Sequence, residues 1–232
     1  MSDFSVGFFT RDAYKEKVYP HLTEYDLLIQ YNESWIGKLS DADWQQQPQL
    51  QNLTLSKEVP LMYVMNAEDH GFSMKIFHEE EVKFTLDISY DIYDKVFNEV
   101  AHELYGEDCW EVMMSSIGTD DNKMDAANER TEKRLKDENI LETETTKALA
   151  NINNESLKIF GIFGFEGEVL QNLKQILTVE NGVEDSRKMV GDLLDCLGLA
   201  PLEFVSYDYL SRGGDDRFEV LNWERRSDFN HS

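Results

Sequence analysis

The segment KIFHEEEVKF, residues 75–84, places a histidine beside three consecutive glutamates, which are side chains used by metal sites and by acid/base catalysis. A metal site needs ligands that converge on one point from several segments. Consecutive side chains of an extended chain point to opposite faces, so His78 and its glutamate neighbours cannot converge by themselves. We therefore interpret this stretch as the tip of a β-hairpin and predict no metal ligands here.

The residues on both sides of the glutamates alternate between apolar and polar, which is typical of paired strands. The runs GFSMKIF (71–77) and VKFTLDIS (82–89) follow the apolar run PLMYVMN (60–66), so we predict a three-stranded antiparallel meander. We expect a three-residue loop that pairs position 78 with 82, because a shift of one residue would disrupt the apolar face. Such loops usually contain glycine, and this one has none. The loop would consist of Glu79, Glu80 and Glu81, and the apolar face of the last strand would hold Val82, Phe84, Leu86 and Ile88.

The motifs of common enzyme classes are missing from the sequence. No GxSxG nucleophile elbow is present, and the five histidines are scattered along the chain. The glycines at 161, 164 and 167 match neither dinucleotide-binding nor phosphate-binding spacing, so we predict no cofactor. Asp69 and His70, in the turn AEDHG, are the best candidates for acid/base chemistry, and we interpret that turn as structural. We predict no catalytic residue, although a hydrolase-type enzyme that uses carboxylates stays open as an alternative.

Charge is the most pronounced feature of the composition. The 46 acidic residues exceed the 22 basic ones by 24, and the excess is spread over the whole chain. Phosphate backbones and anionic membranes attract proteins through lysine and arginine, so we expect neither nucleic-acid nor membrane binding. The sequence begins without a basic, signal-like segment, and its two cysteines, Cys109 and Cys196, form no disulfide framework. These features predict a cytoplasmic protein whose partner is another protein, possibly a basic one.

The remaining segments predict an α+β fold, in which an antiparallel sheet of four or more strands is packed on one face by amphipathic helices. Residues 4–9 predict a first strand, while residues 91–106, 161–177 and 184–199 predict helices with apolar stripes. We expect residues 25–48 to be helical and loop-like. A fourth strand would span residues 109–116, with Trp110, Val112 and Met114 inward, and closing strands would occupy EFVSYDYL (203–210) and RFEVLNW (217–223).

The stretch from 119 to 158 differs in character from the rest of the chain. It has no glycine or proline and holds 10 acids and 7 bases among sparse apolar residues, so we predict a polar helical insert. The chain would then divide into an N-terminal lobe, 1–118, the insert or linker, 119–158, and a C-terminal lobe, 159–232.

We predict that the protein is a non-enzymatic module that recognises a basic protein partner, as inhibitor or immunity proteins do. The predicted binding residues are acidic loop tips. These tips would lie at opposite ends of the middle strand, so at most one belongs to any compact site. The regulatory or structural alternative is self-association through the insert. The tip residues are Glu68 and Asp69 in one loop, and Glu79, Glu80 and Glu81 in the other.

Overall fold

A computed structural model describes residues 4–41, 50–68, 70–117, 122–212 and 217–222. Their centre is one seven-stranded antiparallel sheet in the order β6-β5-β4-β1-β3-β2-β7. This arrangement confirms the predicted α+β class and the predicted meander, which forms β4, β5 and β6. The strands are β1 Phe4–Arg11, β2 Asp26–Gln30, β3 Trp35–Ser40, β4 Leu61–Ala67, β5 Gly71–His78, β6 Glu81–Ser89 and β7 Glu219–Val220.

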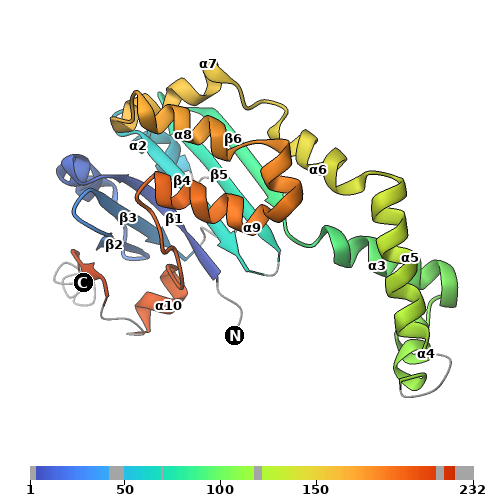
Figure 1. Ribbon diagram of the computed structural model, residues 1–232. Coiled ribbons are helices and arrows are strands. Elements are labelled where there is room, and N and C mark those ends of the chain that lie inside the picture. Colours follow the sequence, from blue (N-terminus) through green and yellow to red (C-terminus); the bar gives the residue numbers. More distant parts are fainter. Residues whose placement is uncertain (1–3, 42–49, 69, 118–121, 213–216, 223–232) are drawn as a thin grey trace.

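Helices cover both faces of the sheet (Figure 1). The helices α8 (Glu168–Ile176) and α9 (Val179–Cys196) lie over one face. They enclose the main core together with the 3-10 segment Lys158–Phe163. Short elements, α1 (Lys15–Val18) and α2 (Leu50–Leu55), contribute to a smaller core on the other face. None of the helices in the described ranges is long and apolar enough to cross a membrane.

The glutamate hairpin differs from the prediction by one residue. Glu79 and Glu80 alone form the turn, with φ of 55° and 61°, because a two-residue turn of this hand needs two left-handed residues. His78 therefore pairs with Glu81, and a β-bulge between the pairs Ile76–Phe84 and Phe77–Val82 restores the predicted register further along. The buried face of β6 holds Phe84, Leu86 and Ile88 as predicted. Val82, expected on that face, is 51% exposed.

Three helices form an arm that projects from the sheet (Figure 1). They are α3 (Ile92–Tyr105), which confirms the predicted helix at 91–106, α4 (Cys109–Ser115) and α5 (Lys123–Asp137). The helices α6 (Ile140–Leu149) and α7 (Asn154–Leu157) lead the chain back to the sheet. The arm encloses its own small core, made of Phe97, Ala101, Cys109, Met113 and Ala127.

Three predicted elements are wrong. Residues 109–116 are helical because Cys109 and Met113, four positions apart, share the buried face. Residues 25–40 contain β2 and β3, which are buried on both faces and therefore lack the alternation that marks a half-exposed strand. The expected strand at 203–210 contains the helix α10 (Tyr207–Ser211), capped by the Ser206 side chain. Of the last expected strand, the structure describes residues 217–222, and among these only Glu219–Val220 is extended.

Candidate functional site

A cleft of about 600 Å³ lies along the outer edge of β6. Its walls come from residues 85–93 of β6 and the start of α3, residues 141–151 in and after α6, and residues 182–189 of α9. Sites that bind small molecules or peptide side chains commonly have volumes of about 300–1,000 Å³. The cleft is therefore large enough for a ligand, and it is the candidate functional site.

The edge of β6 that faces the cleft has unpaired backbone groups. β6 is the terminal strand of the sheet, and the Tyr90 N–H just after it donates to His70 O across the ladder (3.1 Å). Alternate residues of an antiparallel strand direct their N–H and C=O groups to opposite sides. The backbone groups of Thr85, Asp87 and Ser89 therefore point away from β5. Within the described part of the chain, no residue of α6 or α9 hydrogen-bonds to them.

The shape of the cleft depends on a break in α9. Asp185 has extended backbone angles (φ −160°, ψ 96°), and its carboxylate accepts a hydrogen bond from the Lys188 N–H (2.9 Å), which caps the second half of the helix. Gly182 lets α9 approach α6, since a Cβ atom there would lie 2.5 Å from Thr145 Cγ2. The break and the glycine together place residues 182–187 against the cleft.

The charged side chains that line the cleft are mostly acidic. Lys147 Nζ lies 2.6 Å from Glu144 Oε1, and Ser73 Oγ donates to the Asp87 carboxylate (2.6 Å). Arg187 lies over the ring of Tyr90, with its Cζ atom 5.4 Å from the ring centroid. The lining charges are the acids Asp87, Glu144, Glu184 and Asp185 and the bases Lys147 and Arg187.

Tyr90 presents a neutral hydroxyl beside the cleft. Burial raises the pKa of this hydroxyl above its ordinary value, while the neighbouring Arg187 opposes that rise. The hydroxyl lies 3.3 Å from the Asn66 side-chain oxygen. It is therefore a hydrogen-bonding and packing group near neutral pH, not a base.

Exposed apolar side chains gather around the same edge. Tyr93, Leu141 and Val183 are 36–38% exposed and line both the cleft and an adjoining hollow of about 410 Å³. Val82, at the other end of β6, lines a hollow of about 180 Å³. Exposed apolar groups next to an unpaired strand edge are typical of surfaces that bind other chains.

The acidic tips predicted from the sequence do not line this cleft. Glu79 and Glu80 form the turn before β6, where Lys83 pairs with Glu81 (2.6 Å) and Glu79 (3.4 Å). Glu68 is exposed near the opposite end of β5, and Asp69 lies outside the described residues. Among the residues that are described, no group of three or more His, Cys, Asp or Glu side chains is arranged to hold a metal ion.

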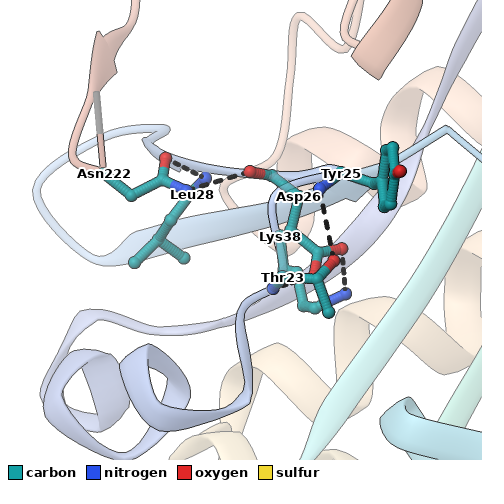
Figure 2. A network of polar contacts seen from close by, with 6 residues as sticks. All are labelled: Thr23, Tyr25, Asp26, Leu28, Lys38 and Asn222. Carbon is teal, nitrogen blue, oxygen red and sulfur yellow. Dashed lines mark hydrogen bonds and ion pairs between the residues drawn. The ribbon is translucent and has the colours of Figure 1, made fainter. Parts of the chain in front are cut away.

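A second polar constellation lies inside the sheet, between β2 and β3 (Figure 2). Lys38 Nζ is 2.7 Å from Asp26 Oδ1, and the two residues are 2% and 1% exposed. The other Asp26 oxygen accepts hydrogen bonds from the N–H and hydroxyl of Thr23 (2.7 and 2.8 Å). The Asn222 side chain bonds to the backbone of Asp26 (2.9 Å) and Leu28 (3.0 Å). A substrate cannot reach this pair in the described conformation, so we assign it a structural role.

Comparison with known proteins adds no identification. No model of a protein family, no curated protein sequence and no solved structure matches the chain. The function must therefore be inferred from the geometry itself.

Proposed function

We propose that the protein is a non-enzymatic binding module that takes up an extended, basic segment of a partner protein along the free edge of β6. The observation that carries the proposal is the outward backbone of Thr85, Asp87 and Ser89 beside an open cleft. A peptide that adds a strand to such an edge gains main-chain hydrogen bonds, while flanking hollows select its side chains.

The charges favour a basic segment. The cleft is lined by four acids and two bases, Lys147 is already paired with Glu144, and the whole chain has a net charge of −24. A negative electrostatic field speeds the encounter with cationic partners and repels anionic ones. Glu79, Glu80 and Glu81 lie at the start of β6 and extend the acidic surface along the same edge, whereas Glu68 lies at the far end of β5.

The dimensions favour a short segment with alternating side chains. The edge from Thr85 to Ser89 is roughly 13 Å long, which matches about five residues of an added strand. A mainly apolar hollow lies at one end, near Tyr93, and a smaller hollow that combines Val82 and Phe84 with polar side chains lies at the other end. The bound segment would therefore combine lysine or arginine with apolar residues, so that both the acids and the hollows are used.

A cytoplasmic location belongs to the same proposal. It is supported by Cys109 and Cys196, which are both free thiols in this fold. Free cysteines are typical of proteins in a reducing compartment.

We expect peptides selected from a random display library to be rich in Lys and Arg that alternate with apolar residues. Binding of a selected peptide should weaken about tenfold or more when Glu144 and Glu184 are both changed to lysine. The matched control changes the exposed Glu16 and Glu58, which lie away from the cleft, to lysine and alters the net charge equally. Fluorescence anisotropy measures both affinities.

Two results would refute the charge-based recognition. Selected peptides could show no excess of basic residues. Alternatively, the change of Glu144 and Glu184 to lysine could weaken binding no more than the control change of Glu16 and Glu58. The second result would mean that the overall charge attracts the peptide and that the cleft does not recognise it.

A further inference from the structure

Three large apolar residues are exposed on α4 and in the turn directly after it, at the far end of the arm (Figure 1). Trp110, Met114 and Ile117 are 52%, 58% and 55% exposed. Trp110 and Met114, four residues apart, lie on one face of α4, and Ile117 follows in the turn directly after the helix. Tryptophan and methionine are common at protein-binding surfaces, because one supplies a large rigid contact area and the other adapts its shape.

This exposed face is held in place by the opposite face of the same helix. Cys109 and Met113 are fully buried in the small core of the arm. The Trp110 ring lies 5.9 Å from the ring of Phe97, which restricts its orientation. The hydroxyl of Ser116 accepts a hydrogen bond from Lys123 N (3.0 Å) and so ties the end of α4 to the start of α5. The apolar face is therefore pre-organised and does not need to fold on binding.

Acidic residues border the apolar face. Glu111 lies one position after Trp110 and three before Met114, and the exposed Glu107 and Asp108 precede the helix. The nearby base Lys123 directs its Nζ toward the ring of Tyr105, 5.9 Å from its centroid. A second copy of the chain would bring the same acids together and would add its own charge of −24, so charge opposes self-association at this face.

We propose that the α4 face, defined as Trp110, Met114 and Ile117 with the flanking Glu111, docks a basic amphipathic helix of a partner protein. The apolar stripe of that helix would cover the three apolar side chains, and its lysines or arginines would face Glu107, Asp108 and Glu111. Helix docking of this kind relies on apolar anchors at spacings of three and four residues. The surface is separate from the β6 cleft, and the proposal does not depend on strand addition there.

The test uses a fluorescent Leu/Lys peptide of about 18 residues, which forms about five helical turns, and an otherwise identical Leu/Glu peptide. We expect the protein to bind the Lys peptide at about 0.15 M salt, where long-range attraction is screened. The triple variant Trp110→Gln, Met114→Gln and Ile117→Gln keeps every charge and should bind at least about tenfold more weakly. Tyr25→Gln, which removes another exposed aromatic residue, should bind like the unmodified protein.

A second variant separates charge from apolar contact. Glu111→Lys leaves the three apolar residues intact, so it should weaken binding of the Lys peptide and strengthen binding of the Glu peptide. This variant tests the proposal even if the triple variant does not fold. Equal binding of the Lys peptide by unmodified protein and folded triple variant would overturn the proposal. Sedimentation that shows a dimer of the unmodified protein and a monomer of the triple variant would also overturn it, because a second copy would then cover the face.

Discussion

Replacing Lys38 by methionine is expected to lower the free energy of unfolding by about 3–5 kcal/mol, because the change leaves the Asp26 carboxylate buried without its cation. Asp26 is 1% exposed, so water cannot replace the lost Lys38 contact of 2.7 Å. Thr23 would still donate two hydrogen bonds to the carboxylate, but these bonds do not neutralise the charge. Urea unfolding followed by circular dichroism measures the difference.

The matched control removes the charge from both partners. The double variant Lys38→Met with Asp26→Asn should regain a large part of the lost stability, since the asparagine oxygen can still accept from Thr23 and no buried charge remains. If the single and double variants were equally unstable, the loss would come from packing and the buried ion pair would not explain it.

Replacing Thr85 by proline is expected to weaken peptide binding at the β6 edge by about tenfold or more. Proline lacks the N–H that the added strand would use, and it is tolerated on an edge strand where that N–H points away from the sheet. The N–H of Thr85 points away from β5, so the ladder between β5 and β6 should keep its hydrogen bonds. Anisotropy with a peptide selected from the display library measures the loss.

Thr85→Val is the matched control, because valine keeps both the N–H and the branched side chain. We expect it to bind within about threefold of the unmodified protein. Equal affinity of the Pro and Val variants would show that the peptide does not pair with the backbone of β6, and would contradict strand addition.

The strand β6 and the helix α3 could be predicted because each has one solvated face. Phe84, Leu86 and Ile88 alternate with exposed residues, so the period of two is visible in the sequence. β2 and β3 could not be recognised in the same way, because every residue of β3 is buried and the alternation is lost. Short apolar runs such as residues 109–116 fit a strand and a helix equally well, and only the tertiary contacts of Cys109 and Met113 decide between them.

The candidate site could not be predicted from the sequence, for a different reason. Its walls come from three segments, residues 85–93, 141–151 and 182–189, that are far apart in the chain and carry no shared motif. Its key property is a row of outward-pointing backbone N–H and C=O groups. Every strand has such groups, but they are left unpaired only in a strand at the edge of the sheet. The one usable signal was the acidic balance, which predicts the sign of the partner's charge but not its location.

Amide hydrogen exchange at Thr85 and Asp87 tests strand addition most directly. In the free protein these two N–H groups point into the cleft without a partner, so they should exchange quickly, while Phe84 and Leu86 are protected by β5. With a saturating selected peptide, exchange at Thr85 and Asp87 should slow by about tenfold or more. If the peptide binds and exchange at both residues stays unchanged, the peptide does not add a strand to β6.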